Sequence, residues 1–271
     1  MFKIAIDAGH YRHTPGKRIP KKLDKNQTRE WVLNNRLAEF VAKALEGYEN
    51  VSCIRVDDTT GETSTGLQSR CDKANQWGAD FFLSIHHNAG IHGGSGGGIV
   101  AYSYKNSKKN SNTYRDAIYD ACIASGGLKG NRAKPKNTAT YHVLKYTKMP
   151  AVLMEYGFMD SKTDVPVILL DSYAKAMAEA TVSAIAKVAG LTKKVQRVSL
   201  SLPYLQKGAK GEAVRAMQIL LVGKGFSCGS KGVDGSFGGD TLKAVTAYQT
   251  SKNIYPDGLC GKTTWGSLLG V

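Results

Sequence analysis

The chain has 271 residues, with 37 basic and 22 acidic side chains and a formal net charge of +15 at pH 7. Its 42% hydrophobic content is typical of a globular protein, and its length allows one large domain or two unequal ones. The five cysteines are scattered and form no C-x-x-C pair, which argues against both a disulfide framework and a thiolate metal site. The positive charge favours an anionic partner, but no motif of a known nucleic-acid-binding module is present, so we expect no nucleic-acid partner.

The N-terminal segment gives no sign of export. It enters a predicted strand at once, without the basic and apolar regions of a secretory signal. No apolar run approaches the length of a membrane span, so we expect no membrane insertion. We therefore expect the chain to be made in the cytoplasm without a signal peptide and to act elsewhere only after release.

Strand-like and helix-like segments alternate over the first 190 residues. Short apolar runs predict strands at 2–8, 51–56, 81–85, 99–104 and 151–154. Apolar positions at helical spacing predict helices at 28–45, 67–77, 111–125 and 171–189, the second capped by Ser64 or Thr65. This alternation predicts an α/β fold, with a mostly parallel twisted sheet and helices on both faces.

The chain changes character after residue 190. Residues 191–203 contain a lysine pair and few helix-forming signals, and they are predicted to be a linker between a domain at 1–190 and one at 204–271. In the tail, the segment Asp234–Thr241 recurs 23 residues later as Asp257–Thr264. Each copy is a tight Asp-Gly turn followed by a helix start. We therefore predict a small all-α C-terminal domain of about three short helices.

Three of the predicted strands end in residues that could bind a metal or move a proton. The run 2–8 is followed by Gly9 and His10, the run 81–85 by His86, and the run 151–154 by Glu155. In open α/β sheets, reactive groups gather at the carboxyl ends of the strands. With Glu30, at the start of a helical pattern, the set contains two imidazoles and two carboxylates. This set fits a catalytic zinc with three protein ligands and a separate general base.

Each of these residues also has an ordinary structural explanation. A carboxylate at Glu30 complements a helix dipole, and Glu155 is also explained as a partner for Arg132. Asp7 is interpreted as a residue that orients an imidazole.

Two adjacent histidines end the strand that begins at residue 81. His87 is an alternative ligand to His86. Neighbouring residues on an extended strand point to opposite faces, however, so both should not reach one metal.

Taken together, three segments resemble the signature strands of the zinc-dependent N-acetylmuramoyl-L-alanine amidases of cell-wall lytic enzymes. They are Ile4–His10, Ser84–Ala89 and Val152–Phe158, supported by Arg70, Ala74-Asn75 and Ala79-Asp80, and the resemblance covers about Met1–Gly190. It implies that His10, Glu30 and His86 are the zinc ligands and that Glu155 is the catalytic carboxylate. The implied reaction is hydrolysis of the amide between N-acetylmuramic acid and L-alanine by a zinc-activated water.

The tail independently resembles a peptidoglycan-binding repeat domain over about Val198–Leu269. The matching segments are Leu205–Gly208, Gly211–Val214, Asp234–Gly238 and Asp257–Gly261, with Cys260 where a valine-like residue is expected. Both resemblances imply bacterial peptidoglycan as the partner, and the basic residues suggest contact with anionic wall polymers as well. A wall hydrolase without an export signal suggests a phage endolysin, and an autolysin exported by another route is the alternative.

Two other enzyme classes remain as alternatives. A zinc peptidase cutting within the stem peptide would use the same metal site. A metal-independent glycosidase would use Glu30 and Glu155 as its carboxylate pair and would need neither His10 nor His86.

Overall fold

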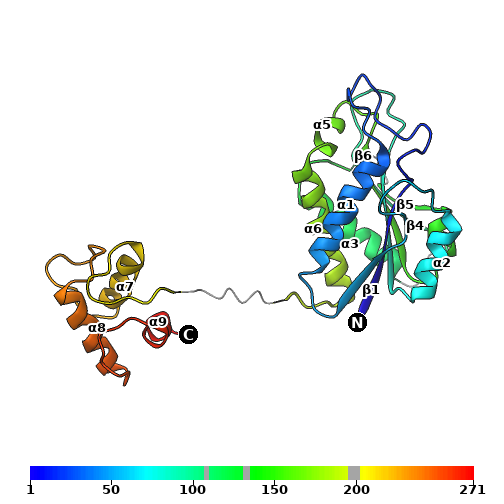
Figure 1. Cartoon of the computed structure of the whole chain (residues 1–271). Helices are drawn as coiled ribbons and strands as arrows, with labels where there is room; N and C mark the ends of the chain where they lie inside the picture. The colour runs from blue at the N-terminus through cyan, green and yellow to red at the C-terminus, as the bar shows by residue number, and fades with distance from the viewer. Residues whose placement is uncertain (107–109, 131–134, 195–201) are drawn as a thin grey trace. The chain divides into compact units, whose positions relative to one another are not determined.

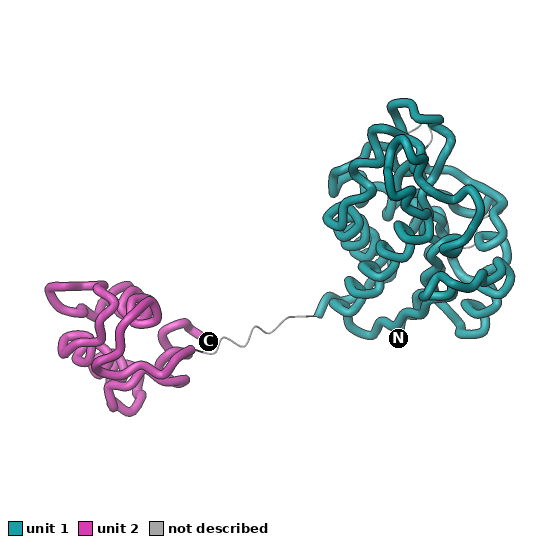
Figure 2. The backbone as a smooth tube through the Cα atoms, turned by 45° about the horizontal axis from the view of Figure 1, so that its top comes forward, with its two compact units in different colours: residues 1–195 teal, residues 196–271 magenta. Residues whose placement is uncertain are grey.

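The computed structural model describes residues 1–106, 110–130, 135–194 and 202–271 of the chain. The chain divides into two compact units, Met1–Val195 and Gln196–Val271, which Figure 2 distinguishes by colour. Much of the predicted linker, together with Arg132, lies outside the described residues. The predicted domain boundaries therefore stay predictions, and the two units are described separately.

Unit 1 is built on a six-stranded sheet in the order β2-β1-β3-β6-β4-β5. The strands are β1 (Phe2–Ala8), β2 (Val51–Arg55), β3 (Phe81–Asn88), β4 (Ile99–Tyr104), β5 (Lys136–Ala139) and β6 (Ala151–Phe158). Neighbouring strands pair in parallel, except that β4 runs antiparallel to β6. The predicted mostly parallel sheet is therefore confirmed.

Helices cover both faces of this sheet (Figure 1). Their bounds are α1 (Glu30–Leu45), α2 (Leu67–Trp77), α3 (Ser111–Ala124), α4 (His142–Tyr146), α5 (Val165–Ile168) and α6 (Asp171–Ala189). Buried side chains of α1, α3 and α6 pack on one face, and those of α2 and α4 pack on the other. None of the helices in the described ranges is long and apolar enough to cross a bilayer.

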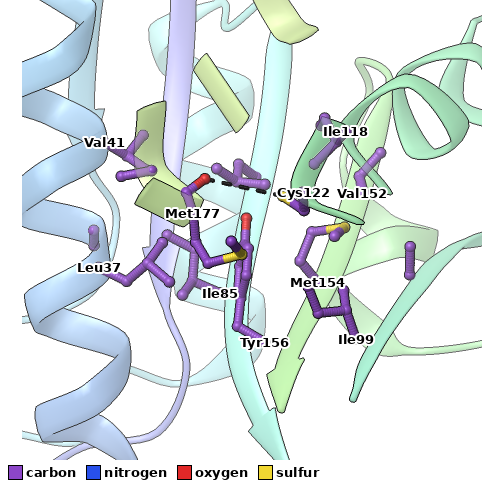
Figure 3. Close-up of a cluster of buried hydrophobic side chains, with 14 of the residues drawn as sticks. Leu37, Val41, Ile85, Ile99, Ile118, Cys122, Val152, Met154, Tyr156 and Met177 are labelled. Carbon is purple, nitrogen blue, oxygen red and sulfur yellow. Dashed lines mark hydrogen bonds between the residues drawn. The ribbon is translucent and has the colours of Figure 1, made fainter. Parts of the chain in front are cut away.

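The larger hydrophobic core lies between the sheet and the layer of α1, α3 and α6. Figure 3 shows Leu37 and Val41 of α1, Ile118 and Cys122 of α3, and Met177 of α6 around the strand residues Ile85, Ile99, Val152, Met154 and Tyr156. Fully burying one such side chain stabilises the fold by about 1.5–3 kcal/mol. This core fixes the height and orientation of the central strands, whose carboxyl ends carry the site.

The alternation of side chains along β3 decides which face each site residue meets. Phe81, Leu83 and Ile85 pack in the α1 layer, whereas Phe82 packs in the α2 layer. Continuing this alternation directs His86 to the α2 side and His87 to the α1 side. On β6, Leu153 packs in the α2 layer, so Glu155 is directed to the same side as His86.

The structure contains three short elements that the sequence did not predict: β5, α4 and α5. They are four or five residues long, too short to show a periodic apolar pattern. The predicted capping of α2 by Ser64 or Thr65 is wrong. The residue at the cap is Gly66, whose backbone is extended and which has no side chain to make a capping bond. Thr65 instead accepts a hydrogen bond from Arg70 Nε through its carbonyl oxygen.

Unit 2 is a small helical unit, as predicted. Its helices are α7 (Glu212–Gly223), α8 (Gly239–Ser251) and α9 (Lys262–Leu269), and they enclose a separate core that includes Met217, Phe237, Tyr248 and Trp265. Cys260 is fully buried in this core, where a small hydrophobic residue is suitable.

The repeat in unit 2 has a structural counterpart in two buried glutamines. Gln218 Nε2 donates to Asp234 Oδ1 and Thr241 Oγ1, and its Oε1 accepts from Gly235 N. Gln249 makes the same set of bonds to Asp257, Gly258 and Thr264. Each Asp-Gly turn is thus fastened to a helix by one side-chain amide.

Candidate metal centre

Three residues from separate parts of unit 1 meet at the carboxyl edge of the sheet. His10 follows β1, His86 lies near the end of β3, and Glu30 begins α1. One potential ligand atom from each lies within 4.8 Å of the others. Glu30 Oε2 is 3.3 Å from His10 Nε2, and Glu30 Oε1 is 3.1 Å from His86 Nδ1. The three residues predicted as zinc ligands are therefore brought together.

The turn after β1 depends on a glycine and on an unusual backbone. A Cβ atom at Gly9 would lie 2.0 Å from Cε1 of His86, so the imidazole can occupy its place only because residue 9 has no side chain. His10 itself has a φ of 67°, in the left-handed backbone region that residues other than glycine rarely adopt. Such strain persists only where the surroundings enforce it.

Arg70 supplies that enforcement from α2. Its Nη1 donates to Ala8 O at 2.7 Å, and its Nη2 donates to His10 O at 2.8 Å. Asp7 accepts a hydrogen bond from Arg70 and another from Ser84 Oγ at 2.7 Å. The interpretation of Asp7 as a residue that orients an imidazole therefore changes. The hydrogen bonds of Asp7 position Arg70, and Arg70 in turn holds the backbone of His10.

A second network reaches the site from the first turns of α1. Asn34 Nδ2 donates to Gly9 O at 3.0 Å, and Asn34 Oδ1 lies 2.8 Å from His87 Nδ1. Burial lowers the pKa of His87 to about 3, so the ring is neutral and its Nδ1–H donates to Asn34. His87 thus points away from the His10, Glu30 and His86 group, as the strand geometry predicted. The sequence analysis missed Asn34, although its spacing of four residues from Glu30 places both on one helix face.

Glu30 is buried between the two histidines, with only 1% of the residue exposed. Burial by itself would raise the pKa of Glu30, but the interactions with His10 and His86 outweigh it and hold that pKa well below its usual value. Glu30 Oε2 has no hydrogen bond of good geometry among the described residues. A buried carboxylate facing two imidazoles is a donor set that suits a zinc ion.

Glu155 lies on β6 beside this group. Burial raises the pKa of Glu155 to about 7, and the charge of His86 offsets this only in part. Its Oε2 is buried and lacks a hydrogen-bond partner in the described part of the chain. A carboxyl group that titrates near neutrality is suited to accept and return a proton. The alternative pairing with Arg132 involves a residue outside the described ranges.

A pocket of about 600 Å³ adjoins this group. His10, His86 and Glu155 lie among its lining residues, together with Lys17, the stretch from Ser64 to Leu67, and Tyr141 to Val143. A pocket of this size accommodates a substrate of several residues or sugar units at the metal group.

Comparison with known proteins supports this reading of both units. Residues 4–187 match the family model described as N-acetylmuramoyl-L-alanine amidase, and residues 210–268 match that of a putative peptidoglycan binding domain.

Among curated proteins, the chain is 33% identical over 193 residues to the N-acetylmuramoyl-L-alanine amidase CwlM of Bacillus licheniformis, covering 71% of each sequence. It is 33% identical over 130 residues to an endolysin of Bacillus phage SPP1, covering 47% of each.

Solved structures show the same fold. The crystal structure of an N-acetylmuramoyl-L-alanine amidase from Clostridium difficile 630 matches 70% of this chain and 97% of that one, with a TM-score of 0.62 and 23% identity. The catalytic domain of CwlV from Bacillus (Paenibacillus) polymyxa var. colistinus matches 71% of this chain and all of its own, with a TM-score of 0.62 and 21% identity. The match over residues 4–187 covers more than half of the sequence, and the chain therefore belongs to the N-acetylmuramoyl-L-alanine amidase family.

Proposed function

We propose that this protein hydrolyses the amide bond between N-acetylmuramic acid and L-alanine in bacterial peptidoglycan, using a zinc ion held by His10, Glu30 and His86. The observation that carries the proposal is the meeting of these three residues next to Glu155, in the part of the chain that matches the amidase family. Glu155 is the residue that we propose moves the proton.

The residues present fit a zinc ion. Two imidazoles and one carboxylate are a common ligand set of catalytic zinc sites, which keep a fourth position open. The unsatisfied oxygen of the buried Glu30 is consistent with a role as a ligand. When bound, zinc supplies a Lewis acid for the scissile carbonyl and lowers the pKa of a water molecule to about 7.

The chain's own residues perform the remaining steps. Glu155 accepts a proton from the attacking water and then donates it to the leaving nitrogen of L-alanine. Arg70 and Asn34 hold the turn at Gly9 and His10 by their hydrogen bonds to backbone carbonyls. His87, which is neutral, keeps Asn34 in position.

We further propose that unit 2 binds peptidoglycan and keeps unit 1 close to its substrate. Tethering makes the second encounter intramolecular and raises the effective substrate concentration. Residues 191–271 carry a higher net positive charge per residue than residues 1–190, because acidic residues are fewer there, which supports additional contact with anionic wall polymers. Because the wall lies outside the cytoplasmic membrane, the protein would act there after release from the cell interior.

The test combines one substitution with identification of the bond that is cut. Glu155→Gln should retain bound zinc but lose at least about 100-fold in turnover, since general acid–base catalysis contributes about 10²–10⁴-fold. A chelator should inactivate the wild-type protein, and added zinc should restore it. Metal content is measured by elemental analysis and cleavage by mass spectrometry of digested sacculi.

Each alternative predicts a different product. The amidase releases stem peptides with a new amino terminus on L-alanine. New reducing sugar ends that persist in the presence of a chelator would identify a glycosidase, and a new amino terminus at a later residue would identify a peptidase. Substantial turnover by Glu155→Gln would remove Glu155 from the proposed role.

A further inference from the structure

The pocket beside the metal centre has two unlike walls. On the wall formed by α2 and α4, Leu67 and Tyr141 line the pocket, although both are large hydrophobic side chains and are 55% and 43% exposed. Val143 and Leu153 continue this apolar lining inward. Large apolar side chains left exposed in a pocket next to reactive groups indicate a surface for a ligand with apolar faces.

This wall is held in place before any ligand binds. His142 Nε2 lies within hydrogen-bonding distance of Gln68 Oε1, at 2.9 Å, which joins the start of α4 to α2. The ring of Tyr141 packs edge-on against Tyr102 with 5.3 Å between centroids. The carbonyl oxygen of Tyr141 accepts hydrogen bonds from Leu144 N and Lys145 N. A rigid aromatic side chain loses little entropy when a ligand stacks on it.

The opposite wall carries a positive charge. Lys17 lines the pocket, its side chain is 44% exposed, and its Nζ lies 3.6 Å from Glu30 Oε2. Its position is fixed by a hydrogen bond from Glu30 N to Lys17 O at 3.0 Å and by the neighbouring Ile19, which is fully buried.

Lys17 is also the basic side chain of the pocket that remains able to bind a ligand. The other arginine or lysine in the lining is Arg70, which is buried and hydrogen-bonded to Asp7 and to backbone carbonyls. An ammonium group has three donors, and the ion pair with Glu30 leaves Lys17 able to bind an anion from the pocket side.

The two walls lie on opposite sides of the sheet. The backbone of Lys17 is hydrogen-bonded to Glu30 at the start of α1, and α1 packs on one face of the sheet. Leu67 and Tyr141 belong to the layer of α2 and α4 on the other face. Figure 1 shows α1 and α2 on opposite sides of the strands. The strand ends that carry the metal centre lie between the two walls. The pocket is therefore apolar on one side of the reacting bond and positively charged on the other.

The proposed substrate has a matching polarity. Its scissile amide joins an uncharged sugar, carrying a lactyl group, to a peptide that contains acidic residues. We propose that the pocket binds it in one orientation, with the N-acetylmuramic acid ring against Leu67 and Tyr141 and a carboxylate of the stem peptide at Lys17. The C–H faces of a sugar suit an aromatic wall, and an ammonium group forms a charge-assisted hydrogen bond with a carboxylate. This inference rests on the proposed function.

The test crosses two variants with two pairs of soluble substrates. The first pair is N-acetylmuramoyl-L-alanyl-D-glutamate and the same compound with both carboxylates of the glutamate converted to amides. Lys17→Met should raise KM about tenfold for the acid, as expected for a lost charge-assisted hydrogen bond, and leave KM for the amide unchanged. Lys25→Met is the matched control, because Lys25 is an exposed lysine of the same loop that does not line the pocket.

The second pair is the muramoyl peptide and the same peptide carrying only the lactyl group. Tyr141→Ala should raise KM about five- to tenfold for the sugar-bearing compound and leave KM for the lactyl peptide unchanged. Tyr141→Phe should behave as the wild type, and Tyr146→Ala is the control, since Tyr146 is 45% exposed on α4 but does not line the pocket.

A binding measurement gives a readout independent of turnover. Calorimetric titration with the free dipeptide L-alanyl-D-glutamate should show about tenfold weaker binding to Lys17→Met and unchanged binding to Tyr141→Ala. The orientation is overturned if Lys17→Met affects the acid and the amide equally, or if Tyr141→Ala affects both members of its pair equally. Failure of the proposed function is distinct, because the wild-type protein would then not release the peptide from either muramoyl substrate.

Discussion

At the scale of single residues, the site depends as much on backbone positions as on the side chains that would bind a metal. Gly9 provides the space that the His86 ring occupies, and His10 adopts a left-handed backbone that Arg70 holds from α2. Altering residues that position the metal ligands commonly changes the metal affinity by about 10–100-fold.

Gly9→Ala should therefore weaken zinc binding without unfolding the protein. The added Cβ would lie 2.0–2.5 Å from three atoms of the His86 ring, so the imidazole must shift from its present place. We expect zinc affinity to fall about 10–100-fold, measured by competition with a chromogenic chelator.

The matched control is Gly66→Ala, at a second glycine that lines the same pocket. Its Cβ would meet only Ser69 Oγ at 3.9 Å, and its φ of −60° suits any residue. Zinc binding that is equally tight in Gly9→Ala and Gly66→Ala would contradict the close approach of the His86 ring as the reason for a glycine at residue 9.

Candidate site residues could be predicted from the sequence where a reactive side chain directly follows a predicted strand. His10, His86 and Glu155 could be found because each follows an apolar run. Glu30 comes from a helix start and follows no strand, so only the family resemblance implied that it, rather than Glu155, is the third ligand. The roles of Arg70 and Asn34 could not be predicted, because they depend on which backbone carbonyls the fold brings within reach.

At the scale of elements, two aspartates fasten the glycine-rich segment between β3 and β4. Asp160 Oδ2 accepts hydrogen bonds from the backbone N–H groups of Gly90, Ile91 and His92 at 2.8–2.9 Å. Asp164 Oδ2 accepts hydrogen bonds from Gly98 N and Phe158 N. The segment from residue 90 to 98 is therefore joined to the residues after β6 by hydrogen bonds from its backbone N–H groups to aspartate side chains, which no sequence pattern shows.

Asp160→Ala should destabilise unit 1 in a pH-dependent way. Burial alone would raise the pKa of Asp160, but the three backbone N–H donors outweigh it, so the folded pKa lies below the usual 3.8. A depressed carboxyl pKa contributes stability above the unfolded pKa and loses it as the pH falls through the folded pKa. We expect a loss of about 2 kcal/mol at pH 7 that shrinks below pH 4.

The measurement is the urea-unfolding free energy of the full chain at several pH values. Asp160→Asn is the control, because it keeps an acceptor oxygen but has no charge to titrate. A difference between Asp160→Ala and wild type that stays constant from pH 7 to pH 3 would be inconsistent with an ionised Asp160 as the acceptor.

The predictability of elements followed their length. Long helices such as α1 and α6 show several turns of apolar spacing, whereas β5 and α4 are defined by the strands and helices that they contact. In unit 2 the repeated Asp-Gly turns were visible in the sequence. The glutamines that bind them were not, because Gln218 precedes its turn by 16 residues and Gln249 precedes its turn by 8.

At the scale of the whole molecule, the two units have separate hydrophobic cores. Residues after α6 still belong to the packing of unit 1, because Glu49 N donates to Thr192 O and Lys194 N donates to Gly47 O. A chain shortened to unit 1 should therefore end after Lys194 rather than at the predicted boundary of 190. This division of cores allows catalysis and wall binding to be tested separately.

A chain ending after Lys194 should cleave a soluble muramoyl peptide as well as the full chain does, because every residue of the metal centre and its pocket lies in unit 1. Its binding to sacculi in co-sedimentation should be weaker by about tenfold or more, since the effective concentration supplied by unit 2 is lost. Full-chain binding should also weaken as salt rises, because screening reduces the attraction between a +15 protein and anionic wall polymers. Normal turnover of the soluble peptide shows that the shortened chain is folded, so equal binding of both chains to sacculi would show that unit 2 is not the wall anchor.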